Sequence, residues 1–530
     1  MAICIGGVAA CQGCRTTSAT GSAVAPEPAS PTLRIYIVSD LAGALEPCGC
    51  VKDQLGGMDH FAAWIASERS KAPNSVLVSA GPLFFLDPVL KDDKRTQDVA
   101  KATTIASSLA GLGLAGFAPG KNDFVAGPSE LERFRNETKG AILMANVGGE
   151  GVKPAWRGPV VREINGVKLG LLGVSMPDRA EGGSPAGITV SAPIDHVRAD
   201  VTSLRAQGAQ VIVALAAVGR GEAKRIADSV PELTAIVVGS PGGSGDVNVE
   251  TPPAERIGNV LIAETGNHLT TAAALDLYVR DGSFSFADGT GLDLARKRTE
   301  IMRRIDELRG KIAQWEGDKK VARADIEARR GDLAVLEKER AELEKAPTPA
   351  KGSFFRYRVQ EVRDSLGKDV AVTEKMLAYY KQVNEENKKA FANKAPRPAP
   401  KGEPSYVGIE TCTSCHDDAR KVWDKTAHAH AYATLANQFK EYNLDCVSCH
   451  VTGYDLPGGS TVTHVKDLKD VQCEVCHGAG SKHVASPAKV KMPIERPSAE
   501  SCLACHHPPH VHEFDAARKM EDILGPGHGR

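Results

Sequence analysis

The stretch Cys473-Glu-Val-Cys476-His477 holds two cysteines that are separated by two residues and followed directly by a histidine. The same pattern occurs at Cys412-Thr-Ser-Cys415-His416, Cys446-Val-Ser-Cys449-His450 and Cys502-Leu-Ala-Cys505-His506. A single CxxC pair also occurs in zinc sites and in redox-active thiol pairs. Zinc ribbons do not need a histidine after every pair, so a fourfold repeat of the whole pattern favours another chemistry.

Two spaced thiols with an adjacent histidine are the attachment signature of c-type haem. The thiols form thioethers with the porphyrin, and the histidine becomes the proximal ligand of the iron. The sequence therefore predicts four covalently bound haem c groups. The attachment cysteines are Cys412, Cys415, Cys446, Cys449, Cys473, Cys476, Cys502 and Cys505, and the proximal ligands are His416, His450, His477 and His506.

The supply of further ligands predicts bis-histidine coordination. Eight histidines remain in residues 404–530, and only Met492 and Met520 offer sulfur. Two histidine ligands favour a lower reduction potential than His/Met. Any one of the eight can instead be a solvated surface residue. They are His428, His430, His464, His483, His507, His510, His512 and His528.

Three stretches resemble the cytochrome c-554 family: Tyr406 to His416 with Thr426-Ala-His428-Ala-His430, Asp445 to Gly453, and Cys473 to Gly480. The resemblance implies an open distal side at the second motif and bis-histidine iron elsewhere. Position by position, it implies that His428 is the distal ligand of the third haem and His483 that of the first. For the fourth haem it implies His528 as the distal ligand, with His510 and His512 as rivals. His464 could close the open distal side of the second haem.

Residues 32–290 alternate short apolar runs with helical or loop stretches, which indicates an α/β layered domain. We expect strands at 34–39, 75–79, 142–146, 167–174, 211–215, 235–238 and 260–263. Fragments such as Ile37-Val-Ser-Asp40 and Gly120-Lys-Asn-Asp-Phe124 resemble the calcineurin-like metallophosphoesterase domain of 5′-nucleotidases. The resemblance implies a β-sandwich with flanking helices.

Phosphate-ester hydrolysis on that fold needs side chains that converge on two metal ions. Of the ligands that the resemblance implies, this sequence keeps only Asp40. The other positions carry Ala42, Pro82, Lys121, Ala217, Ser240 and Gly242. The sequence therefore predicts a domain of this fold without phosphoesterase activity, in which Asp40 is an ordinary polar residue at a strand end.

Two segments join these domains. Residues 291–347 are charged and helical, and their apolar residues follow 4-3-4-3 spacing, which predicts a coiled-coil helix. Gly317 and Asp318 could instead turn this segment into an antiparallel hairpin. Residues 348–403 are expected to hold a helix from about residue 359 to 393 and then a Pro-rich linker.

The N-terminal residues 1–31 predict an export signal and tether. A short apolar run precedes Val8-Ala9-Ala10-Cys11, which looks like a bacterial lipobox with a lipid-accepting cysteine. An exported, membrane-anchored lipoprotein on the periplasmic or cell-surface side follows, and haem attachment outside the cytoplasm agrees with it. Cys48 and Cys50 form a CxC pair for which a disulfide, a metal contact and free thiols are all possible.

The net charge of −1 gives no argument for nucleic acid as a partner. The leading functional hypothesis is electron transfer between redox partner proteins, with the first domain used for docking or spacing. The alternatives are a haem redox enzyme at an open second iron, a bifunctional cytochrome and phosphoesterase, and an adaptor that recruits a partner, or a second copy, through the coiled coil.

Overall fold

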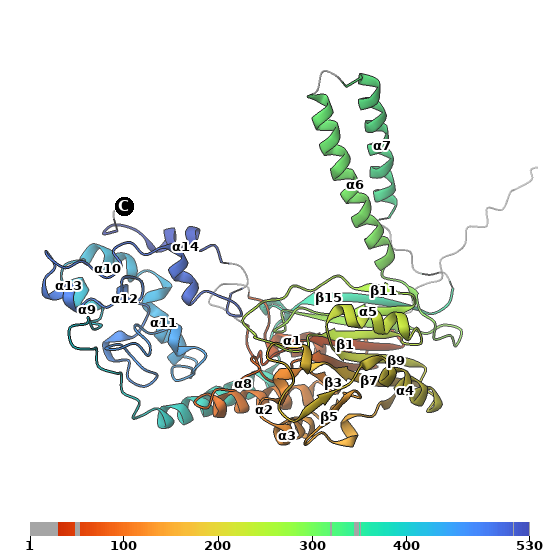
Figure 1. Ribbon diagram of the computed structural model, residues 1–530, viewed down its shortest axis with the longest axis horizontal. Helices are drawn as coiled ribbons and strands as arrows, with labels where there is room; N and C mark the ends of the chain where they lie inside the picture. Colours follow the sequence, from red (N-terminus) through yellow and green to blue (C-terminus); the bar gives the residue numbers. More distant parts are fainter. Residues whose placement is uncertain are drawn as a thin grey trace, which may run out of the picture.

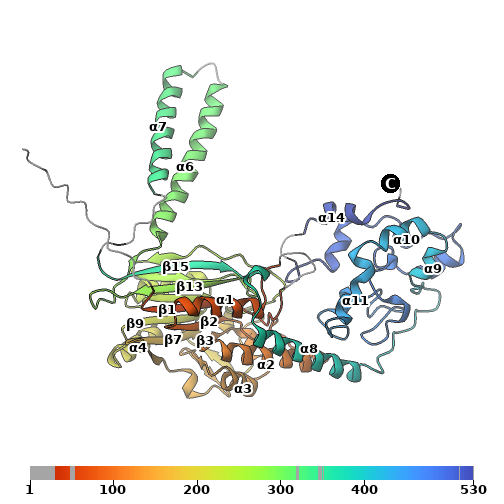
Figure 2. The ribbon, with the colours of Figure 1, turned by 180° about the vertical axis from the view of Figure 1, so that it is seen from behind.

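The computed structural model describes residues 30–47, 54–317, 321–343, 349, 351–511 and 514–528. Its body is a pair of β-sheets, from which two helices project, and a separate C-terminal region of short helices and loops lies beside it (Figure 1, Figure 2). The expected multidomain chain with an α/β first domain is confirmed. In the part of the chain described, no helix has the length and apolar character that a membrane span requires.

The first sheet has seven strands in the order β14-β15-β13-β1-β2-β3-β4. β1 pairs in parallel with β2 and antiparallel with β13, so the sheet is mixed. The strands are β1 (Leu33–Ser39), β2 (Ser75–Gly81), β3 (Leu114–Pro119), β4 (Ala141–Ile142), β13 (Thr271–Tyr278), β14 (Ala287–Asp288) and β15 (Phe354–Glu361).

The second sheet has six strands in the order β11-β12-β10-β9-β7-β6, and β5 (Val147–Gly149) pairs separately with β8 (Ile188–Val190). Parallel pairs join β7 to β9, β9 to β10 and β10 to β12. The strands are β6 (Val160–Ile164), β7 (Val167–Ser175), β9 (Val211–Ala217), β10 (Ala235–Gly239), β11 (Glu255–Ile257) and β12 (Val260–Ala263).

Each central strand is buried on both faces, which explains its continuous apolar sequence. In β1, Ile35 and Ile37 face the second sheet, whereas Tyr36 and Val38 face the helices, because side chains alternate along a strand. The helices on the first sheet are α1 (Met58–Lys71), α2 (Arg95–Gly111), α3 (Pro128–Thr138) and α8 (Val370–Ala390). Those on the second are α4 (Pro193–Ala206) and α5 (Arg220–Ser229).

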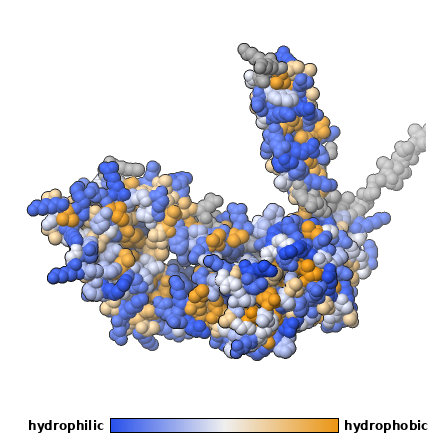
Figure 3. Space-filling view, viewed as in Figure 1, coloured by the Kyte–Doolittle hydropathy of each residue, from blue (hydrophilic) through white to orange (hydrophobic). Residues whose placement is uncertain are grey.

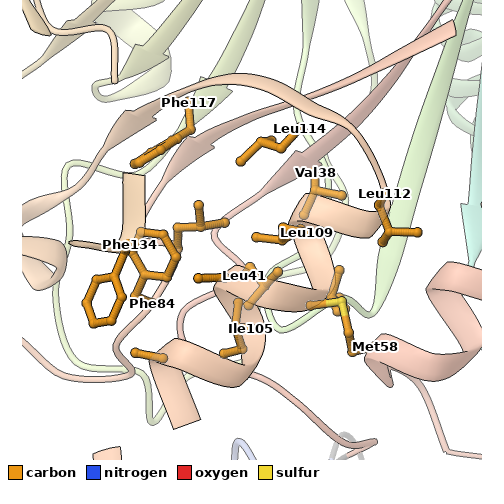
Figure 4. Packing of buried hydrophobic residues seen from close by; sticks show 14 of the residues in the cluster. Val38, Leu41, Met58, Phe84, Ile105, Leu109, Leu112, Leu114, Phe117 and Phe134 are labelled. Atoms are coloured by element: carbon orange, nitrogen blue, oxygen red, sulfur yellow. The ribbon is translucent and has the colours of Figure 1, made fainter. Parts of the chain in front are cut away.

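Figure 4 shows part of the core between the first sheet and its helices. Leu114 and Phe117 from β3 pack there with Ile105 and Leu109 from α2. Phe84 lies 4.7 Å from Phe134 between ring centroids. This core anchors α2 and α8, which are also the helices that meet the C-terminal region.

Strands overlap all seven expected positions, although the third, 142–146, overlaps the two-residue β4 only at Ile142. The sequence prediction missed the longer strands β3, β13 and β15, and also the short or peripheral strands β5, β6, β8, β11 and β14. It also placed a helix from about residue 359, whereas β15 runs to Glu361 and α8 begins at Val370. Along its full length β15 pairs with β13, so the segment expected to hold a helix and linker completes the first sheet.

The projecting helices α6 (Leu292–Glu316) and α7 (Arg323–Glu342) pack against each other as a hairpin (Figure 1). Ile301, Ile305 and Leu336 are buried between them. Ion pairs join Arg309 to Glu337 and Arg330 to Glu316 across the pair. The hairpin alternative therefore describes this segment, and the apolar spacing is satisfied within the chain.

The C-terminal region has little apolar core of its own. The one large apolar cluster among the residues described there contains the buried side chains of Tyr432, Val447, Val451, Val462 and Val465. The helices around this cluster are short: α9 (Ile409–Thr413), α10 (Asp417–Trp423), α11 (Ala431–Ala436), α12 (Cys473–His477), α13 (Ser481–Ala485) and α14 (Ala516–Ile523). Such a region needs another source of buried apolar volume.

Candidate functional site

Three pairs of histidine rings face each other in the C-terminal region. His416 faces His483 with ring centroids 6.4 Å apart, and His477 faces His528 at 6.5 Å. His506 faces His428 at 6.2 Å. Two imidazoles that share one metal ion at bond lengths of about 2 Å have centroids roughly 6 Å apart. Each pair therefore has the spacing that a bis-histidine iron requires, and each contains one motif histidine.

Backbone carbonyls orient several of these rings. Nδ1 of His477 donates a hydrogen bond to Ile494 O at 2.8 Å, and Nδ1 of His483 donates to Val490 O at 2.7 Å. A carbonyl can only accept, so Nδ1 carries the proton and Nε2 keeps a lone pair for a metal. His450 is held in the same way, by a 2.6 Å hydrogen bond from Nδ1 to Ala431 O.

Burial also favours the ligating form of three rings. It lowers the pKa of His428, His506 and His528, with neighbouring histidines acting in the same direction. The neutral imidazole is the form that binds a metal ion. The residues present therefore fit iron held between two histidines at the first, third and fourth motifs.

The pairing differs from the expected assignment at two motifs. His428 faces His506 of the fourth motif, not His477 of the third, and His528 faces His477 instead. The C-terminal tail brings His528 to this position, because it returns past the fourth motif to α10. A Cβ atom on Gly527 would lie only 2.7 Å from Ala419 N in that helix. The position of His483 opposite the first motif follows the expected assignment.

The second motif differs from the others, since no histidine ring of the described residues faces His450 in this way. His464, the candidate for closing this side, has Nδ1 3.0 Å from Thr463 Oγ1 instead. His510 packs edge-on against His507 at 5.6 Å. Cys11, Cys48, Cys50 and His512 lie outside the described residues.

Contacts between thiols show which motifs are neighbours. A hydrogen bond with Cys473 raises the pKa of Cys412, so the first and third motifs adjoin. A hydrogen bond with Cys505 lowers the pKa of Cys449 to about 6, so the second and fourth motifs adjoin. Cys502 in turn lies within electrostatic range of Cys476. The motifs thus form the spatial series first, third, fourth, second.

A buried carboxylate that the sequence analysis missed ties the first and third motifs together. Glu474 is 1% exposed, and it accepts hydrogen bonds from the backbone N–H groups of Val407, Gly408 and Gly480 at 2.8–3.1 Å. Burying a carboxylate is unfavourable unless hydrogen-bond donors compensate its charge, and these backbone N–H groups do so. The sequence held a signal for this role, because Glu474 lies between two attachment cysteines, where haem attachment requires no acidic residue.

The residues just before the second motif are held by the first domain. Asp445 accepts from Lys94 at 2.5 Å and from Lys101 at 2.6 Å. The buried Gln97 side chain accepts from Leu444 N and donates to Asn443 Oδ1. These contacts place α2 against the attachment cysteine Cys446. Sequence reasoning did not find them, because the partners lie more than 300 residues apart.

Loops at the carboxyl ends of the strands fill the expected metal site with hydrogen bonds inside the protein. Asp40 Oδ1 accepts from Ser240 N at 2.8 Å, and burial raises the pKa of Asp40 to about 7. The Asn122 amide donates to the carbonyl oxygens of Leu86 and Gly243. Lys121 Nζ donates to the carbonyl oxygen of Glu181. Within the described residues, no group of three or more His, Cys, Asp or Glu side chains converges as a two-metal hydrolase site requires.

Residues 411–478, which span the first three motifs, match the family model described as cytochrome c554 and c-prime. The C-terminal region is similar to cytochrome c-554. Cytochrome c-554 from Nitrosomonas europaea is 29% identical over 134 residues, a match that covers 19% of this chain and 57% of that protein. The chain therefore spans just over half of this relative, and the similarity concerns the cytochrome region alone.

Solved structures with partial similarity include three hydrolases. The 5′-nucleotidase precursor from Thermus thermophilus has a TM-score of 0.43 and 15% identity, over 80% of this chain and 69% of that one. A calcineurin-like phosphoesterase from Bacillus subtilis has a TM-score of 0.39 and 20% identity, over 47% and 86%. The sulfate thiohydrolase SoxB from T. thermophilus has a TM-score of 0.40 and 13% identity, over 49% and 56%.

Replacement of His428 by alanine should convert one of the four haems from low spin to high spin, because one imidazole ligand is lost. The ring pairing predicts that this haem belongs to the fourth motif. In a chain whose fourth motif is already disabled by Cys502→Ser with Cys505→Ser, His428→Ala should therefore add no further high-spin signal. Electron paramagnetic resonance of the purified holoprotein measures this.

The matched control is His430→Ala, which removes an exposed ring two residues away and should leave the spectrum unchanged. A further high-spin signal from His428→Ala in the disabled chain would show that His428 serves another motif.

Proposed function

We propose that this chain transfers electrons through four covalently bound haems, and that its first domain is a catalytically inactive scaffold for them. The observation that carries the proposal is the set of three facing histidine pairs, each built on a different CxxCH motif. Two strong-field imidazoles leave an iron no open position, and such iron exchanges electrons rather than binding substrates.

The surroundings of the motifs support a relay. The motifs form one continuous series, so an electron can pass between redox centres within the chain. Donor and acceptor are other redox proteins outside the cytoplasm, where haem attachment takes place. A lipid on Cys11 would hold the chain at the periplasmic or cell-surface side of a membrane, and Cys11→Ser should then release the protein into the soluble fraction.

The test is a haem count combined with a potentiometric titration of the holoprotein. Pyridine haemochrome spectra should give about four haems per chain, since each motif offers two thiols and a ligand. The titration should be reversible and should show mainly low-spin iron at every potential. About two haems per chain, or reduction that cannot be reversed, would refute the relay.

The first domain should show no phosphoesterase activity. Hydrolysis requires metal ions that neutralise the transferred group and lower the pKa of the attacking water. The Asp40 carboxylate accepts hydrogen bonds from the backbone N–H and the hydroxyl of Ser240, and Lys121 places a cation where a metal ligand is expected. With nucleotides or a chromogenic phosphodiester in excess Mn²⁺, Zn²⁺ or Mg²⁺, the purified protein should give background hydrolysis only. Metal-dependent turnover that Asp40→Ala abolishes would instead establish a bifunctional enzyme.

A second candidate function is a haem redox enzyme at the second motif. The observation that favours it is the lack, within the described residues, of a histidine ring opposite His450. An iron with one free position can bind and convert a small molecule. Nitric oxide and carbon monoxide are suitable probes. Spectral shifts of one haem with both probes, followed by catalytic consumption of nitric oxide, would favour the enzyme over the simple relay.

A further inference from the structure

The segment 481–496, which follows the third motif, is basic and exposed. It carries four exposed cationic side chains, and Glu495 is its only acidic residue. Lys491 lies 3.7 Å from Glu495, and the other three cations form no ion pair with the residues that the structure describes. The four cations are Lys482, Lys489, Lys491 and Arg496.

Two large apolar side chains are exposed among these cations. Val484 is 43% exposed and Ile494 is 47% exposed. Figure 3 shows strongly hydrophilic side chains at the outer end of the C-terminal region, where Figure 1 places α13. A polar, charged rim around a small apolar contact is the usual composition of a transient protein interface. Cations in such a rim mainly raise the rate of encounter with a partner of opposite charge.

The same segment is bonded to two of the proposed iron ligands. Val490, between Lys489 and Lys491, accepts the hydrogen bond of His483 at 2.7 Å. Ile494, whose side chain is exposed, accepts the hydrogen bond of His477 at 2.8 Å. One hydrogen bond therefore separates the backbone of this surface from a ligand of the first haem and from a ligand of the third. No other segment within the described residues is hydrogen-bonded through its carbonyls to rings from two facing pairs.

The two ends of the motif series also differ in access. Cys446 at the second motif is half-buried, and it follows directly after Asp445, whose ion pairs with Lys94 and Lys101 hold it against the first domain. The first and third motifs lie at the opposite end of the series, next to α13 and away from the sheets (Figure 1). A protein partner can approach that end without displacing the first domain.

We propose that the segment 481–496 is the docking surface for an acidic redox protein, which exchanges electrons with the chain through the first and third haems. The inference rests on the proposed electron transfer and adds the site of entry and the charge of the partner. Its cations attract the partner, its exposed Val484 and Ile494 form the contact, and its carbonyls connect that contact to His483 and His477.

The test uses small oxidants of opposite charge on the reduced holoprotein, because the natural partner is unidentified. Each ferricyanide ion accepts one electron and becomes ferrocyanide, and each tris(phenanthroline)cobalt(III) ion accepts one electron and becomes cobalt(II). In the wild type, added salt should slow ferricyanide and accelerate the cobalt complex. Replacement of all four cations by glutamate should slow ferricyanide about tenfold or more and accelerate the cobalt complex, since electrostatic steering changes association rates by about 10–1,000-fold.

A matched control changes the net charge by the same amount at exposed positions far from the motifs. It combines Arg162→Glu, Lys168→Glu, Lys311→Glu and Lys338→Glu, and it should change either rate less than twofold. Glutamine at the four positions of segment 481–496 removes the attraction without adding repulsion, and it should give intermediate rates. Unchanged low-spin spectra and haem content in each variant show that the ligands stay in place.

Three results would overturn the proposal. Equal slowing by the control would mean that only the overall charge matters, and unchanged ferricyanide rates would place electron entry elsewhere. In the third result, the wild type binds vesicles of anionic phosphatidylglycerol, whereas the glutamate variant loses this binding but keeps its oxidation rates. The surface would then be a membrane contact. In each case a reversible redox titration would still support electron transfer by this chain. Failure of the titration would refute both the electron transfer and the docking surface.

Discussion

Without covalent haem, residues 404–530 should fail to fold, while the two-sheet domain stays intact. The first domain has three large buried apolar clusters. Among its described residues, the cytochrome region has one cluster of five buried side chains, although it is more than a hundred residues long. A chain segment with so small a core cannot offset its conformational entropy, which is about 1–2 kcal/mol per residue for the backbone alone. The haems must supply the missing apolar volume.

The measurement is limited proteolysis of a chain in which all eight motif cysteines are replaced by serine. Trypsin should rapidly remove the cytochrome region, with its many lysines, and leave a protected fragment that ends near α8. Circular dichroism of that fragment should show the same thermal transition as the first domain in the holoprotein. The single variant Cys415→Ser, which leaves one thioether at the first motif, is the control and should stay resistant. Equal resistance of the haem-free chain would contradict the expectation.

Replacement of Asp445 by alanine should release the cytochrome region from the first domain at a cost of about 3–5 kcal/mol, the usual effect of breaking a buried ion pair. The carboxylate lies between Lys94 and Lys101, and the three side chains are only 15–23% exposed. Burial alone would raise the pKa of Asp445, but the two lysines outweigh it and hold that pKa well below its usual range. Without Asp445, Lys101 loses its only ion-pair partner within the described residues.

The pH dependence of this contact follows from the same shift. The pKa of Asp445 is lower in the folded than in the unfolded chain, so its contribution is fully present above the unfolded pKa of about 4. It is lost as the pH falls below that value toward the folded pKa. The free energy of unfolding of the wild type should therefore fall more steeply with acidification below pH 4 than that of Asp445→Ala.

Urea titration, with the radius of gyration from X-ray scattering, measures the release. The matched control is Asp455→Ala, which removes an exposed carboxylate 3.2 Å from Lys394 and should cost less than about 1 kcal/mol. The double variant Lys101→Met with Asp445→Leu should regain most of the lost stability. It removes both charged partners together, so that no buried charge is left unpaired, and Lys94 keeps its ion pair with Asp98. A single variant that unfolds like the wild type would show that the ion pairs do not hold the two regions together.

The sequence determined the parts of this protein that depend on local spacing. The CxxCH spacing fixes two thiols and one imidazole within five residues, so the attachment cysteines and proximal histidines could be named without any structure. Runs of β-branched and other apolar residues located seven of the strands for the same reason. β13 was missed because small alanines fill much of it, and β15 because charged residues alternate with its aromatic ones.

Only the tertiary structure decided which distant residues meet. Seventy-seven residues lie between His428 and His506, and no local pattern near either residue indicates that the two rings pair. The same holds for Glu474 beneath Val407 and for Asp445 between two lysines of α2 and the loop before it. Local spacing follows from covalent geometry, whereas such pairings follow from the packing of segments whose relative positions are set by the whole fold.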